Sequence, residues 1–332
     1  MKSPTRPVTS IDVALHAGVS QSTVSRVFIE GSSVAEKTKQ KVFAAARELN
    51  YRPNAFARSL TKNESKLIGL VFPDTDYPIH MQTLQYISHE LQRFGYAAVL
   101  MPWCVDESNH HSIPNIFQYR VDGVIAASAT LNNQLYQECE EFNIPIVQYA
   151  RVADHTNSSY VVSDNYTAGK QAAMLFKKSG AQKAVYLTGD IPTQTNTARQ
   201  LGFSQGWEKL FGAIPKVIET SYDYHQSQTD IRTMLRIDRP DAVFCATDSL
   251  AMSLMDVAKN EFSIIIPQEL KVVGFDDIPQ ASWLNYQLTT FKQDFQRLAN
   301  EAVAILMELI KDGNAKKIEL IIPAELIERA ST

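Results

Sequence analysis

The sequence predicts an N-terminal all-α headpiece of the helix-turn-helix kind, followed by an α/β core of two doubly wound lobes with parallel sheets. Two short helical segments separated by Gly18, with a longer amphipathic segment after them, predict the headpiece. From residue 66 onward, near-continuous apolar strands alternate with helices in two halves of similar size, which is typical of parallel sheets covered on both faces. The charge is also divided, because residues 1–62 carry a formal +6 although the whole chain carries −4. A basic segment on an acidic body is the footprint of a nucleic-acid-binding head, and a solvated basic tail is the alternative.

The composition indicates a cytoplasmic protein with a sizeable core. The chain has 332 residues, 45% of them apolar, which suits two or three domains. No apolar run approaches the roughly 20 residues of a membrane span, and no apolar stretch follows Lys2 and Arg6 as in a signal peptide. Cys104, Cys139 and Cys245 are far apart and odd in number, so we expect reduced thiols, no disulfide framework and no metal site.

The first helix is predicted over residues 10–17. Thr9 and Asp12 have the spacing of a capping box at its start. Gly18 allows a tight turn at its end. Three apolar side chains are expected on its inner face: Ile11, Ala14 and Leu15.

Two further helices complete the predicted headpiece. Ser20 can cap the second, over residues 21–28, and its valines, Val24 and Val27, are expected to point inward. The third runs from 36 to 49 with an apolar stripe of Val42, Ala45, Ala46 and Leu49. Asn50 can take a left-handed conformation at its end, and Pro53 ends the unit.

The second helix carries an unusual set of outward-facing polar side chains. They are Ser20, Gln21, Ser22, Thr23, Ser25 and Arg26. Residues near the start of a recognition helix reach base edges, and their neighbours reach phosphates. Gln21 and Ser22 suit base edges, and Arg26 can pair with guanine through two hydrogen bonds. A serine-rich solvated helix is the alternative.

Residues 53–65 predict a short helix that needs outside support. Asn54 can cap it, and Arg58 and Leu60 lie within it. A helix of this length is not stable alone in water, so its order must come from a partner.

The core strands are expected over residues 67–73, 97–103, 123–128, 145–150, 160–164, 184–189, 216–220, 241–247 and 271–277. Helices between them include 80–94, 166–178, 197–211 and 248–260. The sequence shows neither low-complexity segments nor a repeat of 20–50 residues.

Over nearly its whole length, the chain resembles the lactose/galactose (LacI/GalR) repressor family. The headpiece stretch "VTSIDVALHAGVSQSTVSRV" carries the likeness, which continues through "ELNYRPNAFARSL", "GLVFPDTDYP", "VVSDNYTAG", "ARQLGF", "DAVFCATDSLA" and "VVGFDDIPQA". The resemblance implies a dimeric or tetrameric transcription regulator with a hinge helix and an effector-binding core like that of periplasmic sugar-binding proteins. The expected boundaries are 1–52 for the headpiece, 53–65 for the hinge helix and linker, and 66–332 for the effector-binding and dimerisation core. Within the core, the first lobe is expected to comprise about 66–162 and 292–322, and the second about 163–291 and 323–332.

The resemblance assigns roles in DNA binding. Gln21, Ser22 and Arg26 match base-reading positions, and Ser20, Thr23 and Ser25 match phosphate-side positions. Leu60 matches a leucine that wedges into the minor groove, which would bend the duplex, and Asn54 and Arg58 are expected to contact DNA beside it. The headpiece departs from the family pattern at Ile29, at Ala35, and in the order of Ser10 and Ile11.

The effector is expected beyond the carboxyl ends of the strands, where Asp74, Tyr77, Ser128, Thr247 and Asp276 stand. The resemblance adds an arginine that reaches into the cleft, Arg199, and an aromatic wall at Tyr222. Each has an alternative: Asp276 and Asp277 can cap a turn, Arg199 can pair with an acid, and Tyr222 can belong to the core. Asp164 is either structural or ligand-facing.

The predicted effector is a sugar or sugar derivative, because carboxylates that accept hydroxyl groups beside an aromatic wall favour one. Purine-binding relatives have an arginine at one of the two positions that Thr193 and Thr195 occupy here, which argues against a purine as the effector. The first lobe departs from the family at Tyr77, Ile79 and His80, so analogy does not predict the ligand itself.

The leading hypothesis is therefore a ligand-controlled, sequence-specific DNA-binding repressor with a pseudo-palindromic double-stranded operator. The rival is a solute-binding protein, which would have a secretion signal and no basic headpiece. An enzyme is disfavoured, since neither nucleotide-binding glycine motif occurs and no catalytic triad stands out. We expect no cofactor and no membrane partner. The last residues, "ELIERAST", form no heptad repeat, which favours a homodimer over a tetramer.

Overall fold

The computed structural model describes residues 8–28, 32–52, 64–73, 77–105, 111–112, 116–127, 133–152, 157–191, 193–313 and 315–332. The chain forms two compact units, residues 1–65 and 66–332, which we treat separately as the headpiece and the core. Several predicted positions lie outside the described residues: Ile29, Asn54, Arg58, Leu60, Asp74 and Ser128.

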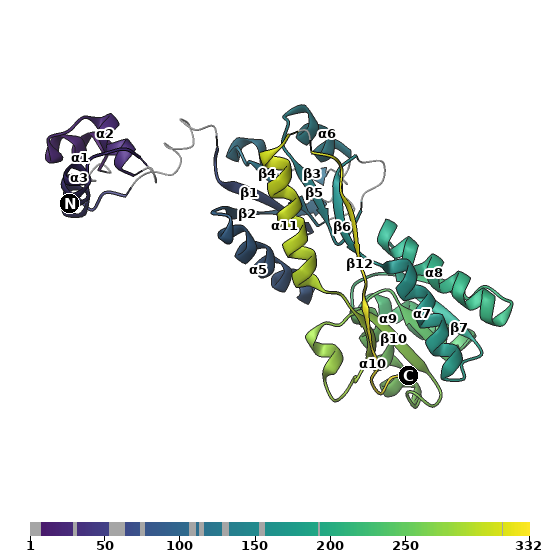
Figure 1. The fold of residues 1–332 in the computed structure, drawn as a ribbon. Coiled ribbons are helices and arrows are strands. Elements are labelled where there is room, and N and C mark those ends of the chain that lie inside the picture. The colour runs from purple at the N-terminus through teal and green to yellow at the C-terminus, as the bar shows by residue number, and fades with distance from the viewer. Residues whose placement is uncertain are drawn as a thin grey trace. The chain divides into compact units, whose positions relative to one another are not determined.

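The headpiece consists of helices α1 (Ser10–Ala17), α2 (Gln21–Val27) and α3 (Glu36–Glu48) around a small apolar core (Figure 1). The predicted capping box is confirmed, because Thr9 and Asp12 exchange hydrogen bonds between side chain and backbone. Gly18 has φ 68° and Asn50 has φ 51°, so both take the left-handed conformation expected of them.

The predicted inner face of α1 is wrong at two of its three positions. Ile11 and Leu15 are 55% and 78% exposed, whereas Val13 and Ala14 are buried. The buried stripe is therefore rotated by about one residue. Val13 and Ala14, with partly buried Ala17, pack in the cluster shared with α2 and α3.

The first lobe of the core is a sheet of seven strands among the described residues, in the order β12-β6-β5-β4-β1-β2-β3. The strands are β1 (Leu67–Pro73), β2 (Ala97–Val105), β3 (His111–Ser112), β4 (Gly123–Ala126), β5 (Ile146–Tyr149), β6 (Ser159–Ser163) and β12 (Glu319–Ile322). Its helices are α5 (Pro78–Arg93), η1 (Ile116–Tyr119), α6 (Asn133–Glu141) and α11 (Phe295–Lys311). Alternate residues of β1 point to opposite faces, since Leu70 joins one apolar cluster and Val71 joins the cluster under α6. Both faces are thus covered, as a parallel sheet requires.

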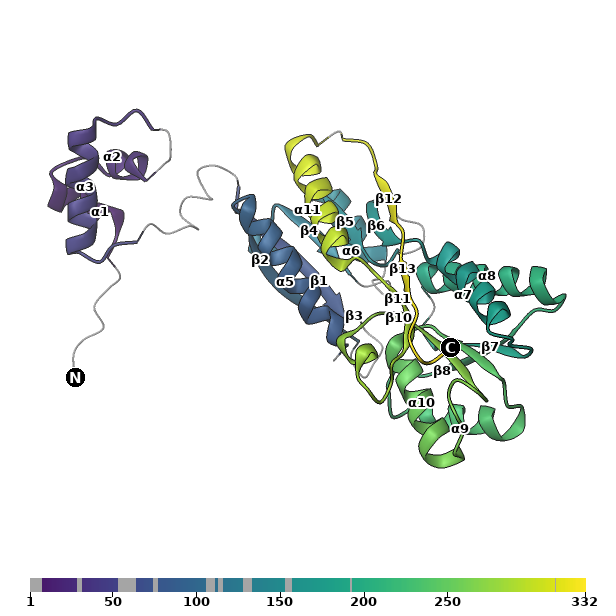
Figure 2. The ribbon, with the colours of Figure 1, turned by 60° about the horizontal axis from the view of Figure 1, so that its bottom comes forward.

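The second lobe is a six-stranded sheet in the order β13-β11-β10-β9-β7-β8. The strands are β7 (Ala184–Gly189), β8 (Lys216–Thr220), β9 (Ala242–Cys245), β10 (Lys271–Asp276), β11 (Thr289–Lys292) and β13 (Glu325–Ile327). Helices α7 (Asn165–Lys178) and α8 (Gln194–Phe211) lie together on one side of this sheet, and α9 (Ser227–Ile237) and α10 (Asp248–Phe262) on the other (Figures 1 and 2). The short helix η2 (Pro279–Ser282) follows β10.

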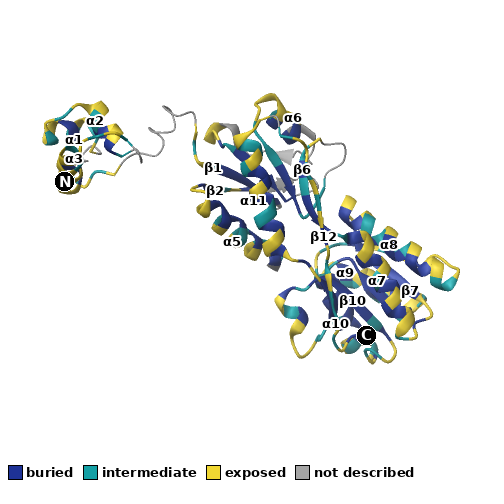
Figure 3. Cartoon of the chain, in the orientation of Figure 1, coloured by how far each residue is buried: buried dark blue, intermediate teal, exposed yellow. Residues whose placement is uncertain are grey.

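The chain crosses between the lobes after β6, after β11 and after β12. Ser163 and Gln293 lie at two of these crossings, at the end of β6 and just after β11. Figure 3 shows buried residues concentrated along the strands of both sheets. The expected strands are confirmed in place, with ends that shift by one or two residues, while the short strands β3, β11 and β13 were not expected.

Candidate functional site

The candidate recognition surface of the headpiece is the polar side of α2. Ser20 is the N-cap, and its Oγ accepts a hydrogen bond from the Thr23 backbone N–H at 3.2 Å. All the polar residues from 20 to 26 are exposed except Thr23, which is half-buried, whereas Val24 and Val27 are buried as predicted. The helix therefore presents Gln21, Ser22 and Arg26 to solvent from a rigid base.

Neighbouring helices fix the position of α2. The Gln21 amide donates to Ser10 Oγ at 3.2 Å, so the start of α2 is tied to the start of α1. At its other end, the Phe28 ring packs edge-on against Phe43 of α3, with centroids 5.4 Å apart. Such support gives the polar side chains the fixed geometry that base recognition needs.

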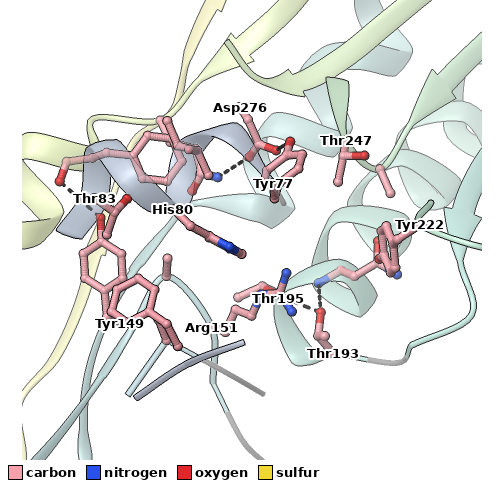
Figure 4. Close-up of a pocket in the computed structure, with 18 of the residues that line it drawn as sticks. Tyr77, His80, Thr83, Tyr149, Arg151, Thr193, Thr195, Tyr222, Thr247 and Asp276 are labelled. Atoms are coloured by element: carbon pink, nitrogen blue, oxygen red, sulfur yellow. Dashed lines mark hydrogen bonds between the residues drawn. The ribbon is translucent and has the colours of Figure 1, made fainter. Parts of the chain in front are cut away.

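A cleft in the core is lined by residues of both lobes (Figure 4). Tyr77, Ile79, His80, Thr83 and Tyr149 come from the first lobe. The second lobe contributes Thr193, Thr195, Asn196, Arg199, Tyr222, Ala246, Thr247 and Asp276, and Gln293 comes from a crossing segment. The structure thus brings together every predicted effector residue that it describes.

Asp276 is held in the cleft by an unusual backbone. It has φ 121° and the next residue, Asp277, has φ 54°. Such conformations cost about 1–3 kcal/mol each in residues with a side chain, and they cluster at functional sites. They turn the two neighbouring carboxylates apart: Asp276 lines the cleft, whereas Asp277 pairs with Arg329 at 2.7 Å. This placement favours the cleft-facing alternative for Asp276.

Arg199 is buried and fixed by three of its five N–H donors. Nε and Nη2 donate to Asn165 Oδ1 at 3.1 and 2.6 Å, and Nη1 donates to the Ala246 carbonyl. The guanidinium also lies over the Phe275 ring, 3.3 Å from its centroid. No acid is bonded to Arg199 among the residues that the structure describes, so two N–H groups remain for a ligand.

Two of the threonines that line the cleft are also helix caps. Thr193 caps α8 and Thr247 caps α10, each accepting from a backbone N–H in the first turn. Both helices thus begin at the cleft, where their N-termini favour electron-rich ligand atoms. Asp164 likewise caps α7 and accepts from Thr167 at 3.0 Å, which supports its structural alternative.

Tyr222 forms a wall of the cleft, beside Gly189 at the end of β7. A Cβ at residue 189 would lie 2.1 Å from the Tyr222 ring, so glycine is needed for this close approach. Tyr222 is half-buried and lines the cleft, which favours the wall over the core alternative.

Sequence reasoning missed Thr83, Tyr149, Arg151, Asn196 and Gln293. Tyr149 ends β5 and could have been found from the rule that ligands bind beyond strand ends. Gln293 follows β11, whose four residues gave no strand signal. Thr83 is one turn inside α5 and carries no signal that marks it as a cleft residue.

Next to Thr247, Asp248 is a fully buried carboxylate. Among the residues that the structure describes, no cationic side chain donates a hydrogen bond to it. It accepts from the Thr290 hydroxyl at 2.6 Å and from the Ile278 N–H at 2.9 Å. Burial first, and the charge of Asp276 second, raise the pKa of Asp248 to about 7. Glycine at 274 makes room for it, since a Cβ there would meet Asp248 Oδ1 at 2.2 Å.

Asp248 should therefore make the core less stable as the pH rises from about 4 to about 7. The folded state holds the proton more tightly than the unfolded chain, whose aspartate pKa is about 3.9, so folding is favoured while the proton stays bound. Asp248→Asn is expected to reduce the fall in melting temperature between pH 5 and pH 8 by several degrees. Asp190→Asn, at an exposed position, is the control, and an unchanged slope in Asp248→Asn would contradict the assignment.

No metal cluster of His, Cys, Asp or Glu occurs among the described residues. Within the same residues, no helix is both long and apolar enough to cross a membrane.

Comparisons with known proteins cover both units. Residues 65–330 match the family described as "Periplasmic binding proteins and sugar binding domain of LacI family", and residues 11–54 match "Bacterial regulatory proteins, lacI family". The sucrose operon repressor of Streptococcus mutans is 32% identical, over 96% of this chain and 98% of the relative. The transcriptional repressor PurR of Yersinia enterocolitica is 30% identical, over 96% and 95%. A crystal structure of the Lac repressor dimer bound to operator and an anti-inducer superposes with a TM-score of 0.86 at 28% identity, covering 98% of this chain and 99% of that one.

Proposed function

This chain belongs to the LacI family of bacterial regulatory proteins, and from that premise we propose a sequence-specific repressor whose affinity for its operator is controlled by a small molecule bound in the core cleft. The observation that carries the proposal is the presence, in one chain, of a supported polar recognition helix and a two-lobed cleft. A solute-binding protein needs no recognition helix, so we set aside the alternative that this chain is one.

The DNA contacts proposed for the headpiece follow the geometry of α2. Gln21, Ser22 and Arg26 read base edges, and Ser20, Thr23 and Ser25 meet phosphates. Residues 53–65 act as the hinge, where Leu60 wedges into the minor groove with Asn54 and Arg58 beside it. The hinge becomes helical only on DNA, because a helix this short needs outside contacts.

The effector proposed for the cleft is a carbohydrate or a derivative of one. Asp276 and the free N–H groups of Arg199 can bond sugar hydroxyls, while the rings of Tyr149 and Tyr222 offer apolar walls. The name of the sucrose operon repressor, a relative over nearly the whole chain, supports the same class. Asp74 and Ser128 remain proposed contacts outside the described residues.

The regulator acts as a homodimer on a pseudo-palindromic operator, as the dimeric Lac repressor relative supports. Trp283 and Leu284, on the loop after η2, are 56% and 93% exposed, which suits a surface covered by a second copy. We place the protein in the cytoplasm with its DNA, and we assign it no catalytic role because its relatives are repressors.

Control by the effector follows from linkage. Binding favours whichever arrangement of the two lobes holds the ligand more tightly, and that arrangement biases whether paired hinges can be helical on DNA. An effector moves this equilibrium only by its difference in affinity for the two states.

Arg26→Ala tests the proposal directly. Losing a two-point contact to guanine should weaken binding to the selected operator by about 10- to 100-fold, and binding to random duplex much less. The measurement is a titration of full-length protein with both duplexes at near-physiological salt, after selection of the operator from a random pool. Equal weakening on both duplexes would make Arg26 a phosphate contact, and equal affinity of the unchanged protein for both duplexes would refute the proposed function.

A further inference from the structure

The carboxylate of Asp276 joins the two lobes across the cleft. Its Oδ2 accepts a hydrogen bond from the hydroxyl of Tyr77, which belongs to the first lobe (Figure 4). Its Oδ1 accepts from the Gln293 amide at 2.5 Å. Asp276 itself is only 6% exposed. Each oxygen of Asp276 thus already accepts one hydrogen bond, and because the side chain is buried a ligand has little room to reach the lone pairs that remain.

Tyr77 is positioned to reach across the cleft. It precedes α5 as its N-cap, and its carbonyl accepts from the His80 N–H at 3.0 Å. Its ring meets the His80 ring at a centroid distance of 5.7 Å, and His80 in turn packs against Phe72 at 6.1 Å. Burial and the carboxylates of Asp276 and Asp248 raise the pKa of Tyr77 well above its ordinary value, so the phenol stays a donor.

Asp276 cannot turn away from Tyr77 without breaking a second contact. Gln293 is buried, and its Oε1 accepts from Ser163 Oγ at 2.6 Å, so its amide is oriented with the donor toward Asp276. Ser163 and Gln293 both lie where the chain crosses between lobes. The contact of Tyr77 with Asp276 is thus connected, through Gln293 and Ser163, to two of the segments that join the lobes.

We propose that Tyr77 is a latch that, while no effector is bound, holds the two lobes together by occupying, on Asp276, the acceptor position that a hydroxyl of the effector takes. This inference rests on the proposed function, since it concerns the same cleft. The effector must replace the phenol, so Tyr77 determines specificity in addition to holding the lobes together. Only ligands that present a hydroxyl donor at Oδ2 recover the hydrogen bond that is lost.

The latch makes a prediction that needs no ligand. Tyr77→Phe removes the donor and keeps the ring, so the lobes should separate more often. Hydrogen exchange followed by mass spectrometry on the full-length protein should then show several-fold faster exchange in peptides covering residues 77–84 and 271–282. Asp276→Asn should raise exchange in the same peptides, and the double variant should add little more.

Tyr166→Phe is the matched control. Its hydroxyl donates to Gln205 at 2.6 Å within the second lobe, away from the cleft, so losing it should leave exchange at 77–84 and 271–282 unchanged. The latch is refuted if the amide hydrogens of these peptides exchange at the same rate in Tyr77→Phe as in Tyr166→Phe. Melting temperatures recorded beside the exchange separate lobe opening from general loss of stability.

A second measurement separates a latch from an ordinary contact. Glucose, fructose, sucrose, cellobiose and ribose are titrated by calorimetry into the unchanged protein and into Tyr77→Phe. A sugar that displaces the phenol should bind the variant about tenfold more tightly, since the competing charge-assisted hydrogen bond is gone. Weaker binding to the variant would make Tyr77 a ligand contact and overturn the latch, and if no sugar binds either protein the exchange result decides. Failure of operator binding would refute the regulator without touching this result.

Discussion

Replacing Val24 with aspartate is expected to unfold the headpiece and to abolish specific operator binding, while the core stays folded. Val24 is fully buried in the cluster that joins α1, α2 and α3. An unpaired carboxylate there costs several kcal/mol, and a unit this small has little stability to lose. Operator titration should show at least a 100-fold loss, since only nonspecific attraction to DNA would remain.

The two compact units allow the loss to be located. Residues 66–332 have their own apolar clusters, so calorimetry on Val24→Asp should keep the core transition and lose the headpiece transition. Leu15→Gln is the control for folding: Leu15 is 78% exposed, so the headpiece transition should survive. A headpiece that melts normally with Val24→Asp would mean that Val24 is not part of its core.

Local signals predicted much of this fold. The strand Leu67–Pro73 is a continuous apolar run between polar residues, and in the structure it begins and ends at the residues predicted from the sequence. The capping pair Thr9 and Asp12 is equally local, because its hydrogen bonds join residues three apart. Such features can be predicted from the sequence because they depend only on residues that are neighbours along the chain.

Features that depend on the partner of an element were harder to predict. The inner face of α1 was misread at Ile11 and Leu15 because this apolar pair has the i, i+4 spacing of one helix face, as Val13 and Ala17 also do, and only the packing of α2 and α3 decides between the two faces. The cleft showed the same limit. The chemistry of Asp276 and Arg199 could be predicted from their motifs, but the contact of Tyr77 with Asp276 joins residues 199 positions apart.

The close approach of α7 and α8 gives the last prediction. A Cβ at Gly202 would lie 2.0 Å from the Tyr166 carbonyl oxygen, and one at Gly169 would lie 2.2 Å from that of Arg199. Both obstacles are backbone atoms, so even Gly202→Ala must push the helices apart. Overpacking of this kind costs about 1–3 kcal/mol and more where backbone cannot yield, so the core transition should fall by about 5 °C or more.

The same displacement should damage the cleft, because Arg199 on α8 bonds Asn165 on α7. Gly202→Ala is thus expected to lose effector binding together with stability, as measured by the melting temperature with and without a sugar that binds the unchanged protein. Gly206→Ala, whose Cβ would meet Ala173 Cβ at 3.1 Å, should cost less, and Leu201→Ala, half-exposed on the same helix, least. The ranking follows from what each new or lost methyl group meets: the Tyr166 carbonyl oxygen at 2.0 Å for residue 202, atoms of Ala173 and Lys170 at 3.1 Å or more for residue 206, and largely solvent for residue 201. If Gly202→Ala melted at the temperature of the unchanged protein, α7 and α8 would separate at no cost, and if it kept effector binding, their contact would not position Arg199.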